Sequence, residues 1–366
     1  MRLFGSIALQ TGLALGQALG QAEEQHTIVE PTITAKDRAH WAWQPLGQAA
    51  IPQVPQAGQL ANPIDHFIAA RLQPHGLGQA PEADTLIVGI APAGGELSGP
   101  LRREIRGAIE RGMRVESGMH FFLNDDEEFS RLAKRSGSTL VDLRKNDEHD
   151  VARFDAFDPD CLRLHTVGND CCVGKMVVSV ELARGMTRGG CETKFVATGQ
   201  TGMLIEGDGC AVDAVVSDFI AGATERLVLA AKGHDAVVVE GQGSLANPRY
   251  SGVTMGLLHG CLPQGLVMCY EAGRAEVVGL EPMPLPPLEE VIASYLSVAN
   301  LQHPCRFIGV AINSRLLSGD EYRREKDLVQ ERLNLPAWDV VRESVDGLVD
   351  EALKLRRQLA DKGSPC

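Results

Sequence analysis

The pattern of apolar and polar positions predicts an α/β protein over residues 84–345. Short, almost wholly apolar runs have the length and composition of buried strands, and segments with a helical period lie between them. Such alternation favours parallel sheets with right-handed crossovers. The predicted strands are Thr85–Ile90, Met113–Glu116, Thr139–Leu143, Leu162–Val167, Lys194–Ala197, Ala236–Val239, Leu266–Tyr270 and Phe307–Ile312. The predicted helices are Pro100 to about Gly112, Asp125–Ser136, one that begins at Met176, and Ser344–Leu359.

The same pattern divides the chain into four parts. Residues 1–83 form a leader with a Pro- and Gln-rich linker, and one short amphipathic helix is expected there at Asn62–Gln73. Residues 84–155 read as a Rossmann-like α/β domain and residues 160–345 as a P-loop NTPase-like parallel-sheet domain. Residues 346–366 form a C-terminal helix and tail, and the helix either closes the sheet or packs on a partner in a homo-oligomer.

The loop after strand Leu162–Val167 has the arrangement of a phosphate-binding P-loop. Strand, glycine-bounded loop, Gly174-Lys175 and helix follow one another. Successive N–H groups, the helix N-terminus and the lysine ammonium would all attract an anion. Five residues separate Gly168 from Gly174, where the common pattern has four, and Met176 stands where Ser or Thr would bind magnesium. The predicted cofactor-binding residues are Gly168, Asn169, Asp170, Cys171, Cys172, Val173, Gly174, Lys175, Met176 and, from a later strand end, Asn313.

Several other strands also end in polar, often glycine-containing loops. In an open parallel sheet these carboxyl ends build the ligand site. Glu240 follows the apolar strand Ala236–Val239, and burial there would raise its pKa toward the range of a general base. The remaining candidates are Thr198, Gln200, Thr201, Ser251, His259, Glu271 and Arg274. For His259 the plainer interpretation is a core histidine after a helix.

Composition narrows the function without deciding it. The formal net charge is −13 and no long basic run occurs, which argues against a nucleic-acid binder. The nine cysteines include no CxxC pair, so a disulfide framework or structural zinc site is not expected, and we predict no metal. Met1–Ala22 resembles a secretory signal, whereas the other observations favour the cytoplasm, and no stretch elsewhere is long and apolar enough to span a membrane.

The motifs also carry two resemblances. GNDCCVGKMVVSVEL, VVVEGQGSL and FIGVAIN resemble the P-loop core of dethiobiotin synthetase. Over about residues 84–345 the chain resembles a P-loop family, formerly of unknown function, that is now represented by D-glutamate N-acetyltransferase. The segments that carry this resemblance are TLIVGIAPAGG, VESGMHFFL, VGNDCCVGKM, FVATGQTGMLIEGDGCAVDAVVSDFIAGATE, VVVEGQGSLANPRYSGVTMGLLHG and VMCYEAGR.

The resemblance implies acetyl transfer from acetyl-CoA to the amino group of D-glutamate or a related amino acid. The P-loop would then hold CoA phosphates, which fits the missing hydroxyl at Met176. From residue chemistry we expect Glu240 as the base and Lys175 near the thioester oxygen. Arg274 would pair with the substrate carboxylate. Thr198, Gln200 and Thr201 would lie near the pantetheine or the acceptor, and Ser251, His259 and Glu271 are secondary substrate-binding candidates.

Two rival functions stay open at this point. One is an ATP-dependent ligase or kinase of the dethiobiotin synthetase type, with Mg-ATP in the same loop and Asn313 reading adenine. The other is a nucleotide-binding protein without turnover. A third alternative concerns the loop thiols: the helix N-terminus would lower the pKa of Cys171 and Cys172, which would allow a nucleophilic relay of the acetyl group. The plainer interpretation is that both are small loop residues whose backbone binds the ligand.

Overall fold

The structure is a computed structural model that describes residues 52–53, 69–71, 83–92, 95–154 and 156–361. The chain separates into two units, Met1–Pro81 and Glu82–Cys366, and the second unit contains both predicted α/β domains. The predicted signal-like segment lies outside the described residues. Of the predicted helix Asn62–Gln73, residues 69–71 are described and are helical.

The first part of the second unit is a small parallel sheet of order β1-β2-β3. Its apolar core joins the strands to both helices through Ile105, Ile109, Val115 and Phe129. The Asp126 side chain accepts hydrogen bonds from the N–H groups of Glu128 and Phe129 and so caps the second helix. The elements are β1 (Thr85–Val88), α3 (Gly99–Glu110), β2 (Arg114–Ser117), α4 (Glu127–Ser136) and β3 (Leu140–Asp142).

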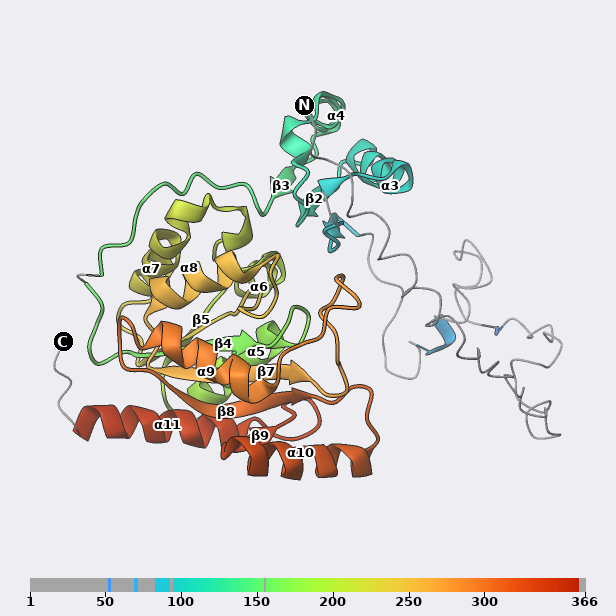
Figure 1. Cartoon of the computed structure of the whole chain (residues 1–366). Coiled ribbons are helices and arrows are strands. Elements are labelled where there is room, and N and C mark those ends of the chain that lie inside the picture. The colour runs from blue at the N-terminus through green and yellow to red at the C-terminus, as the bar shows by residue number, and fades with distance from the viewer. Residues whose placement is uncertain (1–51, 54–68, 72–82, 93–94, 155, 362–366) are drawn as a thin grey trace, which may run out of the picture. The chain divides into compact units, whose positions relative to one another are not determined.

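The second part is a larger parallel sheet of order β5-β6-β4-β7-β8-β9, flanked by helices (Figure 1). The strand with the P-loop, β4, lies in the middle of this sheet, between β6 and β7. Its strands are β4 (Leu162–Gly168), β5 (Thr193–Val196), β6 (Ala236–Val239), β7 (Gly265–Glu271), β8 (Arg306–Asn313) and β9 (Ala337–Trp338). Its helices are α5 (Lys175–Arg188), α6 (Gln200–Glu206), α7 (Ile220–Ala230), α8 (Ser251–Cys261), α9 (Leu288–Ala299), α10 (Gly319–Leu333) and α11 (Asp346–Asp361).

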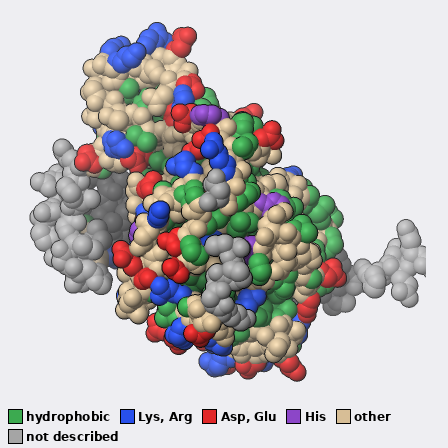
Figure 2. Space-filling model, turned by 90° about the vertical axis from the view of Figure 1, so that its left-hand side faces the viewer, with side chains coloured by type: hydrophobic (Ala, Val, Ile, Leu, Met, Phe, Trp, Pro, Cys, Tyr) green, Lys and Arg blue, Asp and Glu red, His purple; other side chains and the backbone are tan. Residues whose placement is uncertain are grey.

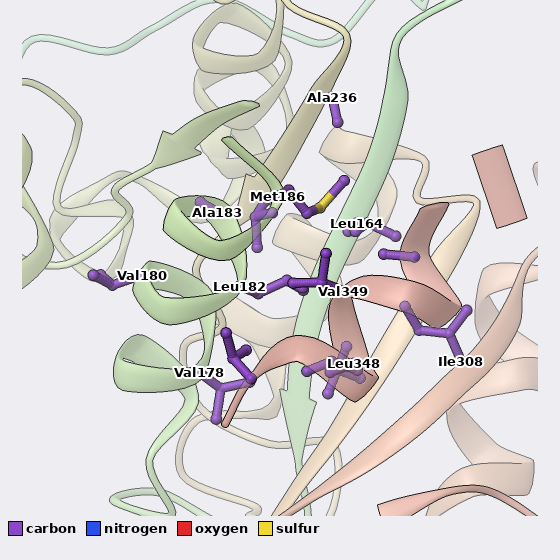
Figure 3. Packing of buried hydrophobic residues seen from close by; sticks show 14 of the residues in the cluster. Leu164, Val178, Val180, Leu182, Ala183, Met186, Ala236, Ile308, Leu348 and Val349 are labelled. Carbon is purple, nitrogen blue, oxygen red and sulfur yellow. The ribbon is translucent and has the colours of Figure 1, made fainter. Parts of the chain in front are cut away.

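Both faces of the larger sheet are buried, because alternate residues of each strand enter different apolar clusters. On one face, β-strand residues such as Leu164 and Val267 pack with α5 and α11 (Figure 3). On the other, Leu266 and Met268 pack with α9 and α10, and Val237 packs with α7 and α8. Burial on both faces explains why these strands read as continuous apolar runs instead of alternating ones.

The C-terminal helix closes the face that carries α5. Leu348, Val349, Ala352 and Leu355 of α11 all enter the same cluster as Leu182 of α5. Gly185 permits this close packing, because a Cβ there would lie 2.7 Å from Val349 Cγ2. Of the two roles expected for this helix, the structure therefore displays closure of the sheet.

The segment between the two sheets is fastened along α7. The buried carboxylate of Glu225 accepts hydrogen bonds from the N–H groups of Arg153 and Phe154, at 2.7 and 2.6 Å. Gly222 lets the linker backbone approach, because a Cβ there would lie 1.9 Å from Asp150 O. These contacts give the short connection a defined path between the two sheets.

The strands and helices whose bounds were predicted are confirmed to within two residues at most ends. No bounds were predicted for β9 or for helices α6 to α10. Within the described residues, no helix is long and apolar enough to cross a membrane. On the face drawn in Figure 2, acidic and basic side chains are interspersed.

We expect Leu182→Ala to lower the free energy of unfolding by about 2–5 kcal/mol, the range for a large-to-small change in a packed core. Leu182 is 0% exposed and lies in the cluster between the sheet, α5 and α11. Urea denaturation followed by circular dichroism measures the change. Leu316→Ala is the matched control, because this leucine is 69% exposed. Equal effects of the two substitutions would contradict the described core.

Candidate functional site

The P-loop connects β4 directly to α5 at the centre of the carboxyl edge of the sheet. Gly174 has φ 104°, a conformation that L side chains rarely adopt, and it forms the N-cap of α5. At the other end of the loop, Gly168 O accepts hydrogen bonds from Ser244 Oγ at 2.7 Å and Tyr295 Oη at 2.9 Å. The first turn of α5 presents N–H groups that have no intrahelical acceptor. The loop is thus a fixed cradle for an anion.

Lys175 places a buried ammonium in this cradle. Its side chain donates to Asp170 O at 2.7 Å and is 6% exposed. Burial lowers the pKa of Lys175 from its ordinary value. Within the described residues no carboxylate lies within ion-pair distance of this ammonium, which has three donors in all. A buried cation in this state favours an anionic ligand beside it.

A cluster of charges fixes the loop from the side of β7. Arg274 donates to Asp170 Oδ2 at 3.1 Å, to Cys171 O at 2.7 Å and to Glu271 Oε2 at 2.9 Å. Asp170 also accepts from Asn247 Nδ2 and from the Val278 N–H, at 2.9 and 2.8 Å. Burial alone would raise the pKa of Asp170, but these hydrogen bonds lower it. The guanidinium expected to face the substrate therefore holds the loop in place.

Glu240 lies at the end of β6 beside the start of α6. Its Oε2 accepts from the N–H groups of Thr198 and Gly199, at 2.9 and 3.1 Å. Burial raises the pKa of Glu240 to about 7, against the opposing effect of these hydrogen bonds and of nearby Lys175. Gly202 leaves room for the carboxylate, since a Cβ there would lie 2.3 Å from Oε2. The carboxyl group can therefore exchange a proton near neutral pH.

An apolar pocket adjoins the end of the P-loop. Its volume is about 200 Å³, and it is lined by residues of the loop and α5, of the end of β8 and of the segment after β9. Apolar walls come from residues such as Val173, Val177 and Val340. The polar lining residues are Asn313, Arg315, Asp339 and Arg342. The pocket therefore borders both the loop and Asn313.

Three loop residues have surroundings that the sequence did not indicate. Met176 packs against the core cluster beneath α5. Burial raises the pKa of the Cys171 thiol to about 11, so the expectation of a lowered value is wrong for this residue. Desolvation of the thiolate raises this pKa by more than the positive charge of Lys175 lowers it. Asn169 Oδ1 is buried and accepts no hydrogen bond within the described part of the chain.

The remaining candidates fall into two groups. Thr198, Gln200 and Thr201 lie around the start of α6, and Thr198 Oγ1 donates to Glu240 O at 2.8 Å. Ser251 begins α8, whose Thr254 reaches the Gln242 carbonyl after β6. His259 lies near the opposite end of this helix, which runs back toward the start of β7. Its buried Nε2 has no hydrogen-bond partner within the described residues, and a role for His259 in substrate binding stays a prediction.

Several residues of the site were missed from the sequence. Ser244 and Asn247 lie in the polar segment after β6, and their hydroxyl and amide groups were a usable signal. Tyr295 is a core-like position in α9, and nothing in its local pattern marks its bond to the loop. His165, in the central strand, is buried, and burial lowers its pKa to about 4.

Comparison with known proteins places this fold in a family. The model described as "Domain of unknown function (DUF1611_C) P-loop domain" matches residues 150–349. The chain belongs to the DUF1611 family. The companion DUF1611 model, a Rossmann-like domain, matches residues 56–146 and so includes part of the segment predicted as a leader. The α/β organisation predicted from the sequence is confirmed.

Relatives of this DUF1611 chain carry a functional name. It is 36% identical over 274 residues to a D-glutamate N-acetyltransferase of Tritonibacter scottomollicae, covering 74% of this chain and 82% of the relative. A protein of the same name from a Pseudoalteromonas species is 35% identical over 268 residues, which cover 73% and 80% of the two chains. A crystal structure of a DUF1611 family protein from Anabaena variabilis superimposes with a TM-score of 0.70 at 35% identity, covering 75% of this chain and 80% of that one.

We expect the stability of the wild type, relative to a Glu240→Gln variant, to fall as pH rises from about 4.3 to about 7. The unfolded pKa of glutamate is about 4.3, and burial raises the folded pKa to about 7. Between these values the folded state binds more protons, so its advantage is lost as pH rises. Chemical denaturation at pH 4, 5.5 and 8 measures this difference. A constant difference would show that Glu240 is not desolvated.

Proposed function

We propose that this protein transfers the acetyl group of acetyl-CoA to the amino group of D-glutamate or a related amino acid. The names of the relatives that match 73–74% of the chain support this activity. The observation in the site that supports it best is the buried ammonium of Lys175, which has no carboxylate partner in the described residues. In this proposal, the anion that compensates it is a CoA phosphate.

The loop suits phosphates that are held but not hydrolysed. A Mg-nucleotide site of the P-loop type uses a Ser or Thr hydroxyl directly after the lysine as a metal ligand. Here Met176 occupies that position and packs against the core beneath α5. The loss of this ligand favours acetyl-CoA over Mg-ATP as the partner of the loop.

The pocket beside the loop suits the adenine of CoA. It borders the start of α5 and Asn313, and it combines apolar walls with a few polar lining groups. The Asn313 amide can donate to and accept from a base edge. Adenine would occupy this pocket while the phosphates lie on the loop, which leaves the pantetheine arm to reach the reacting groups.

The transfer itself requires a deprotonated amine and a stabilised thioester oxygen. We assign Glu240 as the base that takes a proton from the substrate ammonium, because its pKa of about 7 suits a proton acceptor at neutral pH. The amine nitrogen then bonds to the thioester carbon, the carbon–sulfur bond breaks, and the CoA thiolate takes up a proton. The Lys175 ammonium is committed to the phosphate in this proposal, so main-chain N–H groups near Glu240 are the donors available to the oxygen that gains negative charge.

We expect the purified protein to form N-acetylglutamate from acetyl-CoA and D-glutamate in buffer containing EDTA, with mass spectrometry as the readout. Lys175→Ala should lower kcat/KM by about 10²-fold or more, because a charge-assisted hydrogen bond to phosphate contributes about 1.5–3 kcal/mol and the buried site adds to it. Lys232→Ala, at an exposed lysine, is the control and should retain full activity. Turnover that appears only with ATP and magnesium would contradict the proposal.

We expect kcat/KM to rise with pH through about 7, because Glu240 must be ionised to accept the proton. Glu240→Gln should remove this limb and lower activity by about 10²–10⁴-fold, the usual contribution of a positioned base. Glu240→Asp should retain part of the activity. If kcat/KM of the Gln variant still rises with pH through about 7, a group other than Glu240 accepts the proton.

A further inference from the structure

A second polar cluster lies where the two sheets of the unit meet, outside the P-loop. We name it the junction cluster: His120, Arg144, Gln200 and Asp213. His120 follows β2 and Arg144 follows β3, so both lie at the carboxyl edge of the small sheet. Gln200 begins α6 after β5, at the carboxyl edge of the large sheet. The carboxyl edges of the two sheets, where open parallel sheets bind their ligands, therefore meet at the junction cluster.

Arg144 fixes the geometry of the junction cluster. The guanidinium side chain is 5% exposed. It donates to Gly118 O at 2.5 Å, to Gln200 Oε1 at 2.8 Å and to Asp213 Oδ2. Gly118 makes the close contact possible, because a Cβ there would lie 2.6 Å from Gln200 Cγ. Arg144 is thus a positioning residue, because it links the loop after β2 to the start of α6.

Two groups of the junction cluster retain capacity for a ligand. Asp213 Oδ1 is buried and accepts no hydrogen bond within the described residues. His120 Nε2 lies 3.9 Å from Asp213 Oδ2, and its side chain is 46% exposed. A carboxylate oxygen that needs a donor therefore lies beside an imidazole that is open to solvent. A ligand group with N–H donors and positive charge suits the Asp213 carboxylate, and a ligand carboxylate can accept from an imidazole N–H of His120.

The junction cluster is connected to the proposed reaction site by a single short stretch of backbone. The Gly199 N–H donates to Glu240, and the next residue, Gln200, accepts from Arg144. The Val212 N–H, next to Asp213, donates to Thr198 O at 3.0 Å. Thr198–Gln200 therefore touches both groups. This segment therefore links the junction cluster to the carboxyl group that we assign as the proton acceptor.

We propose that the junction cluster is the binding site of the acceptor amino acid, with its ammonium on Asp213 and a carboxylate on His120. The inference rests on the proposed function, and it names where that function binds its second substrate. A free amino acid is a zwitterion: the Asp213 carboxylate can accept from its ammonium, and the neighbouring His120 imidazole can donate an N–H to its carboxylate. Arg144 stabilises Asp213, and three of its N–H donors already engage protein acceptors, so we assign it a positioning role.

The test is calorimetric titration of D-glutamate into the full-length protein saturated with CoA. His120→Gln and Asp213→Asn should each raise the Kd for D-glutamate at least tenfold, while the Kd for acetyl-CoA stays within twofold of the wild type. Asp218→Asn and His149→Gln, at exposed positions, are matched controls and should leave both constants unchanged. His120→Gln guards against a folding artefact, because this side chain is half exposed.

Glutarate, which lacks the ammonium, distinguishes recognition of the ammonium by Asp213 from a general structural effect of the substitution. The wild type should bind it at least tenfold more weakly than D-glutamate, and Asp213→Asn should abolish this preference. Unchanged D-glutamate affinity in both variants, or no binding to the wild type, would overturn the junction site. A second titration of D-glutamate is made without CoA. If the wild type neither binds acetyl-CoA nor turns over, but binds D-glutamate in this titration in a way that depends on Asp213, the proposed function is overturned and the junction site stands.

Discussion

The buried ammonium of Lys175 is the constraint on which the site depends. A cation in a desolvated position needs acceptors around it, and the chain provides one carbonyl, that of Asp170. That carbonyl is in place because the Asp170 side chain is held by Asn247, Arg274 and the Val278 N–H. These contacts join the P-loop to the β6–α8 connection and to the β7–α9 connection. All three segments therefore help to position the carbonyl that accepts from the Lys175 ammonium. The same arrangement makes an anion the natural ligand.

In the proposed reaction, the pocket at Asn313 and the carboxyl group of Glu240 would serve different parts of the cofactor and its acceptor. The pocket at Asn313 lies beyond the start of α5, whereas Glu240 lies on the other side of β4, at the end of β6. This order follows the strand order of the sheet, with β8 and β7 on one side of β4 and β6 and β5 on the other. A long cofactor can thus place its base at one side of the loop and its reactive end toward the other. The small sheet then adds the junction cluster beside β5, next to the proposed proton acceptor.

The sequence predicted those features that depend on local patterns. The apolar runs located the strands, and Gly174-Lys175 after a buried strand located the P-loop, because a parallel sheet and an anion cradle both need short contiguous signals. Features that depend on long-range contact were not predicted. Arg144 meets Asp213 across 69 positions and Tyr295 meets Gly168 across 127 positions, and neither pair has a local signature. For the same reason, nothing in the sequence indicated that Asp170 and Glu271 would both engage Arg274.

The most direct test of the role of Lys175 is calorimetric binding of acetyl-CoA and of Mg-ATP to the wild type and to Lys175→Ala. We expect acetyl-CoA to bind the wild type in the presence of EDTA. Removal of the Lys175 ammonium should abolish this binding, since this buried cation is the charge that compensates the phosphate. Binding of Mg-ATP without any binding of acetyl-CoA would contradict the proposed function. It would show that the loop serves a nucleotide despite Met176.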